Sequence, residues 1–423
     1  MTSLSARATP LRLVDADRDA RLDLRALLDA AAAAPPSEGV DALAAELTSR
    51  VGASEVSLLI ADISGLTLAR LARRPIPGRT MPLRPAYEHV PIDGTNAGRA
   101  LESQRTQVSS DGDGVWVHVP VSDRGEAIGV LELLLAEMPC ARVLDYLGSA
   151  GHALAYVIIA DRRFSDLYEL GQRSTTLTLE AEIQRRLLPA SYACEGPQFA
   201  LAGWLVPADE AGGDTFDYIV DSSTLHLSIT DAMGHGVPAA QLATLCVGSL
   251  RNGRRRGLGL TEQAQQASAH ISAHAAPDQF VTALLGRIDL RTGALELVNA
   301  GHMNPLLVRN GCVSEIYLDA GLVLGVAPNE AYDVQHFQLL PGDRLALVTD
   351  GMFERDAAEA EIEQLLGTLG HLHPRETVQV LTSAVLHVTG GAARDDATVL
   401  LIDWYGTPGA LPALSPDPPS SPR

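Results

Sequence analysis

The chain contains no lysine. Its 32 basic residues are all arginine and face 52 acidic residues, so the formal net charge at pH 7 is −20. Nucleic acids and anionic membranes are themselves negative, and a charge of this sign disfavours binding to either. We therefore expect no nucleic-acid partner and no membrane partner. The missing lysines and the abundant alanines reflect the composition of the coding genome, not a function.

Long apolar runs and closely spaced cysteines are also missing. No run approaches the ~18–20 residues that a membrane-spanning helix needs, and residues 1–23 contain no apolar core of a signal peptide. The four cysteines lie more than fifty residues apart. This spacing excludes CxxC metal sites and argues against a disulfide framework. The expected location is cytoplasmic.

The apolar pattern of the N-terminal part predicts an α+β domain over residues 22–160. Helices are expected on both sides of a break at Pro35 and Pro36, and again over residues 141–160. Strands are expected at 55–64, 114–123 and 126–135, the last two joined by a hairpin turn. Residues 1–21, which are polar, are expected to be flexible.

A charged helical segment is predicted over residues 161–189. Positions at alternating spacings of three and four form a candidate coiled-coil seam: Leu167, Leu170, Ser174, Leu177, Ala181, Gln184 and Leu188. Ser174 and Gln184 dilute this seam because they are polar. Two interpretations stay open, a signalling helix that forms a homodimer and a connecting helix packed on a neighbour.

Residues 190–405 predict a strand-rich α/β domain. Its clearest strands lie in "TLHLSITD", "VTALLGRIDLRTGALELVNAGH" and "GDRLALVTDG", and a helix is expected after Gly236. The basic run "RNGRRRG" at 251–257 is expected to be a solvated loop, with a docking surface for an acidic partner as the alternative. The Pro- and Ser-rich tail at 406–423 is expected to be disordered.

Four aspartates of this domain share one setting. Each lies within a few residues of glycine, and three of them adjoin an apolar strand: Asp214, Asp231, Asp350 and Asp395. Gathered carboxylates repel one another, so burying them together requires a cation or protonation. Oxygen ligands without cysteine or paired histidine favour Mg²⁺ or Mn²⁺ over zinc.

Seven motifs of the C-terminal part occur in the order of a known family. They are "QRRLLP", "GGDTFDY", "TDAMGHGVPAA", "FVTALLGRIDLRTGALELVNAGHMNPLL", "LGV", "LPGDRLALVTDGMFE" and "RDDATVLLI". This part resembles the bacterial serine phosphatases of the type 2C metal-dependent (PPM) superfamily, in particular the RsbU/SpoIIE-like branch. The resemblance implies an α/β-sandwich that holds two divalent cations, Mn²⁺ or Mg²⁺.

The resemblance also implies a role for each matching residue. Asp214 and Asp231 would be shared or first-metal ligands, and Ala232 would contribute its backbone carbonyl. Asp350 and Asp395 would complete the shell of the second metal, whereas Asp396 is the less favoured ligand of its pair. Two ions ~3.5–4 Å apart can activate a water molecule for in-line attack on a phosphoryl group. The implied substrate is a phosphoserine on an anti-anti-sigma (STAS-type) protein of a partner-switching module.

Several other residues near these motifs are not assigned as ligands. Thr230, Met233 and Asn304 depart from the branch pattern and could change loop shape, metal affinity or turnover. His235 and His302 are interpreted as structural residues in preference to catalysts. Asp217 is expected to support its loop, and Glu354 matches an acidic position without an assigned role.

The N-terminal part has a likeness of its own. "HVPIDGTNAGRALESQRTQV" and "VWVHVPVSDRGEAIGVLELLL" resemble GAF sensory domains over residues 38–160. The resemblance implies a small-molecule or protein input. His89, His118 and Cys140 are candidate ligand contacts, although core or surface roles are favoured.

Two other interpretations of the sequence compete with an active phosphatase. One is a metal-free pseudophosphatase scaffold, favoured by the departures at Thr230 and Met233 and opposed by the four aspartates. The other is a nucleotide cyclase, because "GGDTF" is close to the GGDEF signature. Thr215 takes the place of that motif's acidic residue, and the expected upstream elements are missing.

Overall fold

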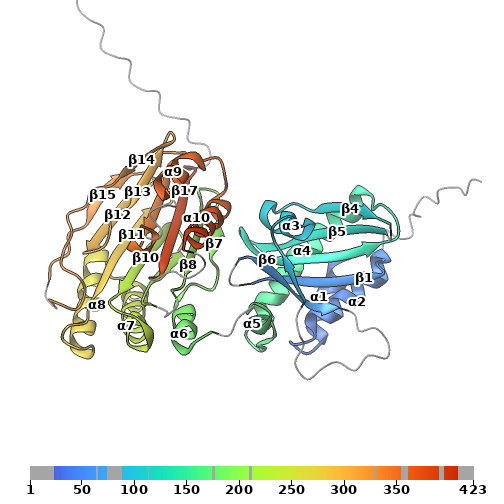
Figure 1. The fold of residues 1–423 in the computed structure, drawn as a ribbon, viewed down its shortest axis with the longest axis horizontal. Helices are drawn as coiled ribbons and strands as arrows, with labels where there is room; N and C mark the ends of the chain where they lie inside the picture. Colours follow the sequence, from blue (N-terminus) through green and yellow to red (C-terminus); the bar gives the residue numbers. More distant parts are fainter. Residues whose placement is uncertain are drawn as a thin grey trace, which may run out of the picture. The chain divides into compact units, whose positions relative to one another are not determined.

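The computed structural model describes residues 23–62, 65–73, 88–112, 114–173, 177–208, 212–327, 330–353, 361–389 and 395–407. These residues form two compact units, coloured along the chain in Figure 1. The N-terminal unit contains the described residues up to 173 without 124–126, which group with the C-terminal unit from residue 177 onward. The expected flexible N-terminus and nearly all of the expected tail lie outside the described residues.

The N-terminal unit is built on a six-stranded sheet of order β3-β2-β1-β6-β5-β4. Its strands are β1 (Glu55–Ala61), β2 (Thr67–Arg73), β3 (Glu88–Pro91), β4 (Gln107–Asp111), β5 (Gly114–Asp123) and β6 (Glu126–Leu135). The predicted hairpin between β5 and β6 is confirmed. Its turn residues Arg124 and Gly125 have φ of 45° and 84°, and two positive φ angles are typical of the tight turns that match strand twist.

Helices cover both faces of this sheet. One face packs against α1 (Leu24–Ala33), α2 (Gly39–Val51) and α4 (Ala141–Asp161), and the other against α3 (Asn96–Ser103). The predicted break between the first two helices is confirmed at Pro35 and Pro36. The α+β architecture expected from the sequence is present, and the likeness to a GAF domain stays a prediction.

The candidate ligand contacts of this unit do not come together. His89 is exposed on β3, whereas His118 is buried on β5, and three strands separate these two. Cys140 is exposed at the start of α4. His118 instead pairs with Glu132 on β6, with 3.2 Å between Nε2 and Oε2. The three residues therefore do not form one site.

Helix α4 passes the length and composition test for a membrane span, and it alone does so among the described residues. Its most apolar stretch has a mean hydropathy of 1.4. Leu147, Leu154 and Ile158 are fully buried in the core of the N-terminal unit. That burial is the pattern of a core helix.

The expected continuous helix over 161–189 is wrong. Among the described residues α4 ends at Asp161, α5 covers Leu167–Gly171, and α6 covers Leu179–Leu187. The seam positions do not share one helix, because Leu167 and Leu170 lie on α5 whereas Ala181 and Gln184 lie on α6. Thr178 caps a new helix start by accepting a hydrogen bond from the Ala181 amide. Ser174 lies outside the described residues, and the homodimer stays a prediction.

The C-terminal unit contains two packed sheets. The β10 sheet has the order β15-β12-β11-β10-β9, and the β17 sheet has the order β14-β13-β16-β17-β8-β7. The strands are β7 (Ala193–Glu195), β8 (Phe199–Val206), β9 (Thr215–Val220), β10 (Thr224–Ala232), β11 (Val281–Asp289), β12 (Ala294–Ala300), β13 (Leu306–Arg309), β14 (Cys312–Glu315), β15 (Gln335–Gln338), β16 (Arg344–Val348) and β17 (Ala397–Trp404).

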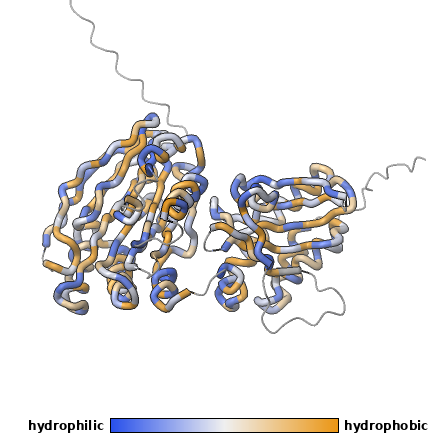
Figure 2. The backbone as a smooth tube through the Cα atoms, in the orientation of Figure 1, coloured by the Kyte–Doolittle hydropathy of each residue, from blue (hydrophilic) through white to orange (hydrophobic). Residues whose placement is uncertain are grey.

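Helices close the outer faces of this sandwich. The β10 sheet packs against α7 (Gly236–Arg255) and α8 (Leu260–His274), and the β17 sheet against α9 (Ile362–Thr368) and α10 (Pro374–Val388). Leu227, Leu284 and Leu347 are among the buried residues between the sheets. Figure 2 shows how hydrophobic residues follow the strands of the unit. The predicted α/β-sandwich is present as four layers, helix, sheet, sheet and helix.

The basic run at 251–257 is not the expected loop. Helix α7 continues to Arg255, and its last turns carry two cations that bind one buried carboxylate. Arg251 and Arg254 each lie 3.0 Å from an oxygen of Asp217, which is 5% exposed on β9. A buried carboxylate requires such partners. Asp217 therefore holds α7 on β9 and does more than support a loop.

Candidate active site

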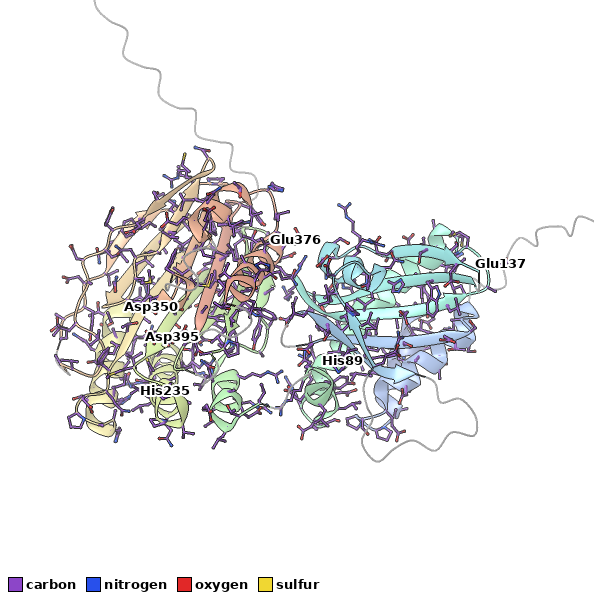
Figure 3. The ribbon with its side chains drawn as sticks, viewed as in Figure 1. His89, Glu137, His235, Asp350, Glu376 and Asp395 are labelled. Atoms are coloured by element: carbon purple, nitrogen blue, oxygen red, sulfur yellow. The ribbon has the colours of Figure 1, made fainter. Side chains whose placement is uncertain are left out.

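The aspartates singled out in the sequence lie at strand ends of both sheets. Asp231 is near the end of β10, and Asp214 directly precedes β9, which pairs antiparallel with β10 so that Thr230 lies opposite Thr215. Asp350 follows β16 at the start of the short helix η2 (Asp350–Met352), and Asp395 precedes β17. Figure 3 labels Asp350 and Asp395 close together in the C-terminal unit. The fold thus collects residues that are far apart in the sequence.

Burial and mutual repulsion weaken the acidity of these carboxylates. Burial, followed by the charges of Asp350 and Asp395, raises the pKa of Asp231 to about 7. Burial and the charge of Asp231 hold the pKa of Asp214 well above its usual range. The pKa of Asp395 is raised as well, mainly by burial. Such a cluster stays ionised at neutral pH only when a cation compensates its charge.

Two threonines of the β17 sheet fix Asp214. The hydroxyls of Thr349 and Thr398 each donate to Asp214 Oδ2 at 2.7 Å, and Thr349 Oγ1 accepts from the Thr398 amide at 3.0 Å. Asp214 is 2% exposed. One carboxylate oxygen is thereby committed to the protein, which leaves Oδ1 as the donor that Asp214 could offer to a ligand.

Glycines let the Asp214 loop lie against its neighbours. A Cβ on Gly213 would sit 2.4 Å from the carbonyl oxygen of Ala232, and one on Gly212 would sit 2.7 Å from Asp396 Oδ2. Both distances are far below van der Waals contact, and at Gly213 the contact is with the backbone, so a side chain at this position would displace the strand that carries Ala232. The loop therefore brings Asp214 beside Ala232, the residue expected to contribute its carbonyl.

Gln184 is a site residue that the sequence analysis missed. Its Nε2 donates to the Asp214 carbonyl at 3.0 Å and to Asp396 Oδ2, and its side chain is buried. The Ala208 amide donates to the other Asp396 oxygen at 2.8 Å. Both Asp396 oxygens are thus held by hydrogen bonds from the chain. The Asp350 side chain, by contrast, is exposed to solvent. The motif "QRRLLP" contained the signal, but Gln184 was assigned to the coiled-coil seam.

The two histidines near the site differ in burial. His235 is exposed at the start of α7. His302 is buried between Thr282 Oγ1, 2.8 Å from Nδ1, and the Val348 carbonyl oxygen, 3.1 Å from Nε2. Burial lowers the pKa of His302 to about 4. The ring is therefore neutral at neutral pH, which fits the structural role predicted for it.

The departures from the branch pattern have local explanations. The Thr230 hydroxyl lies 2.6 Å from that of Thr215, and both side chains are buried. Asn304 accepts from the Leu318 amide at 3.2 Å and so holds the chain that follows β14. Met233 is 44% exposed beside the cluster. Thr215 has no acidic character to offer a cyclase site, and Glu354 lies outside the described residues.

The donor set fits a divalent cation by its chemistry. Every candidate ligand is an oxygen, the glycine loop lies against the Ala232 carbonyl, and the carboxylates repel one another, which a cation relieves. As the side chains stand, no three His, Cys, Asp or Glu residues in the described part of the chain converge as a ready-made ion site.

Comparison with known proteins assigns the C-terminal unit to a family. Residues 221–405 match the family Stage II sporulation protein E (SpoIIE). Protein IcfG of Synechocystis sp. is 22% identical over 255 residues, which cover 52% of this chain and 40% of the relative. Phosphoserine phosphatase RsbU of Bacillus subtilis is 20% identical over 234 residues, covering 53% of this chain and 69% of RsbU.

Similar solved structures include that of the RsbU and RsbW domains of Rv1364c from Mycobacterium tuberculosis. That structure is 25% identical with a TM-score of 0.45, and the match covers 50% of this chain and 62% of the other. The resemblance to the RsbU/SpoIIE-like branch is thus confirmed at the sequence level, by the family match and by RsbU. Residues 221–405, most of the C-terminal unit, are a SpoIIE-family domain homologous to the phosphoserine phosphatase RsbU.

Proposed function

We propose that the C-terminal unit is a metal-dependent phosphatase that hydrolyses phosphoserine on a signalling protein. One observation carries this proposal: a SpoIIE-family domain gathers aspartates from two sheets into a cluster, and burial together with the charges of Asp350 and Asp395 raises the pKa of Asp231 to about 7. Two ions, Mn²⁺ or Mg²⁺, would be held by Asp231, Asp350, Asp395, Asp214 Oδ1 and the Ala232 carbonyl. The relative named a phosphoserine phosphatase supports the same activity.

The chain's own residues would prepare the site for chemistry. Divalent ions bound there would supply an activated water and neutralise the phosphate charge. Thr349 and Thr398 hold Asp214 in one orientation. Gln184 binds the Asp396 carboxylate and so keeps it from replacing one of the proposed metal ligands. Because these groups are set before substrate arrives, little reorganisation is needed during the reaction.

The finer assignments belong to the same proposal. The substrate would be a STAS-type anti-anti-sigma protein, as implied by the resemblance to RsbU. The N-terminal unit would act as a GAF-like input, and the protein would work in the cytoplasm. These assignments are supported by the family membership of the C-terminal unit and by the α+β architecture of the N-terminal unit.

Hydrolysis of p-nitrophenyl phosphate by the full chain tests the activity. We expect turnover with Mn²⁺, none with EDTA, and a loss of at least about 100-fold in Asp231→Asn and in Asp350→Asn, because each removes an anionic ligand. Asp221→Asn is the matched control, since Asp221 is exposed at the opposite end of β10. A wild-type chain that neither binds Mn²⁺ nor turns over would favour the scaffold alternative.

A further inference from the structure

One imidazole joins the two sheets at the end that carries the carboxylates. His302 lies between β12 and β13. Its Nδ1 is 2.8 Å from Thr282 Oγ1 on β11, in the β10 sheet, and its Nε2 is 3.1 Å from the carbonyl oxygen of Val348 on β16, in the β17 sheet. A single ring thus spans the sandwich.

Each partner of His302 adjoins a candidate ligand from a different sheet. Thr282 lies directly opposite Asp231 in the antiparallel ladder of β10 and β11. Val348 is the last residue of β16, two residues before Asp350. The bonds to Thr282 and Val348 therefore link the backbone beside Asp231 to the backbone just before Asp350.

The bonding of the ring is directional. A backbone carbonyl only accepts, so Nε2 carries the proton and donates to Val348, and Nδ1 accepts from the Thr282 hydroxyl. The backbone of His302 is fixed in turn by Asn299, whose Nδ2 donates to the His302 carbonyl at 2.9 Å and whose Oδ1 accepts from the His302 amide at 2.7 Å. A residue that only filled space would need neither arrangement.

We propose that His302 is a positioning residue that, through Thr282 and Val348, sets the separation of Asp231 and Asp350 and thereby the affinity of the site for a divalent cation. The inference rests on the proposed metal site. It assigns a role in that site to His302, which is not one of the proposed ligands. Groups that orient metal ligands typically change affinity by about 10- to 100-fold when removed.

The test measures Mn²⁺ binding to the full chain by isothermal titration calorimetry. Thr282→Val removes the hydroxyl and keeps the shape, and Thr282→Ser restores the hydroxyl. Ser249→Ala is the matched control, because Ser249 Oγ and His270 Nδ1 form a similar 2.8 Å bond between α7 and α8. His302→Ala removes both bonds, and the threonine variants keep the test valid should His302→Ala fail to fold.

We expect about ten-fold weaker Mn²⁺ binding in Thr282→Val and binding within about two-fold of wild type in Thr282→Ser and Ser249→Ala. Equal Mn²⁺ affinity in Thr282→Val and Ser249→Ala would overturn the inference and leave the metal site intact. A wild-type chain that binds no Mn²⁺ would overturn the proposed function, and this inference with it. The two failures are thus distinguishable.

Discussion

The neutral state of buried His302 makes folding depend on pH. Burial lowers its pKa to about 4 in the folded chain, against an ordinary value of 6.5. Between these values the unfolded chain binds more protons, so the contribution of His302 to stability is complete above pH 6.5 and is lost as the pH falls toward 4. The loss amounts to about 3 kcal/mol.

Urea unfolding at pH 7.5 and pH 4.5 measures this effect. We expect His302→Gln to show a smaller drop in the free energy of unfolding between the two pH values than wild type shows, because the titrating ring is gone. The carboxylates contribute equally to both proteins and cancel in the difference. An identical drop in both would contradict a neutral, buried His302.

Sequence alone identified some site residues and missed others for a physical reason. Asp231 and Asp350 were recognisable because each follows an apolar strand within a few residues of glycine, a setting that they share with Asp214 and Asp395. Gln184 was not recognisable, because its partners lie 30 and 212 positions away and only the fold unites them. The partners of His302 were hidden for the same reason.

At the scale of elements, α6 presents one buried polar residue to the site. Gln184→Ala removes the donor to Asp396 Oδ2 and to the Asp214 carbonyl, which leaves buried acceptors unsatisfied. We expect Mn²⁺-dependent hydrolysis of p-nitrophenyl phosphate to fall by about ten-fold or more. Arg186→Ala on the same helix is the control, because Arg186 is exposed and pairs with Glu182 on the surface. Equal activity in the two variants would show that α6 does not position the site.

Element boundaries were predictable where local chemistry sets them. The β5–β6 hairpin follows from alternating apolar residues around a turn with glycine, and α7 begins at Gly236, one residue before the expected start. The predicted loop at the end of α7 was wrong because the sequence of the basic run shows its charge but not the carboxylate that it binds. Arg254 binds Asp217, 37 residues earlier in the chain.

At the scale of the whole molecule, the two units have separate cores. Leu154 is fully buried in the N-terminal unit, and Leu284 is fully buried between the sheets of the C-terminal unit. We expect Leu154→Ala and Leu284→Ala each to destabilise its own unit by about 2–5 kcal/mol. Scanning calorimetry of the full chain should show a different transition moving in each variant. A single transition that moves equally in both would contradict separate cores.

The candidate ligands come from both sheets of the sandwich, Asp231 from one and Asp350 and Asp395 from the other. An ion bound by these ligands would therefore link the two sheets as well as take part in catalysis. Its binding free energy and the cohesion of the two sheets are linked quantities, since whatever binds only the folded form stabilises it. Occupancy of the metal site and the stability of the packing between the sheets then change in the same direction. A substitution that weakens the packing between the sheets would also lower the affinity of the site for the ion.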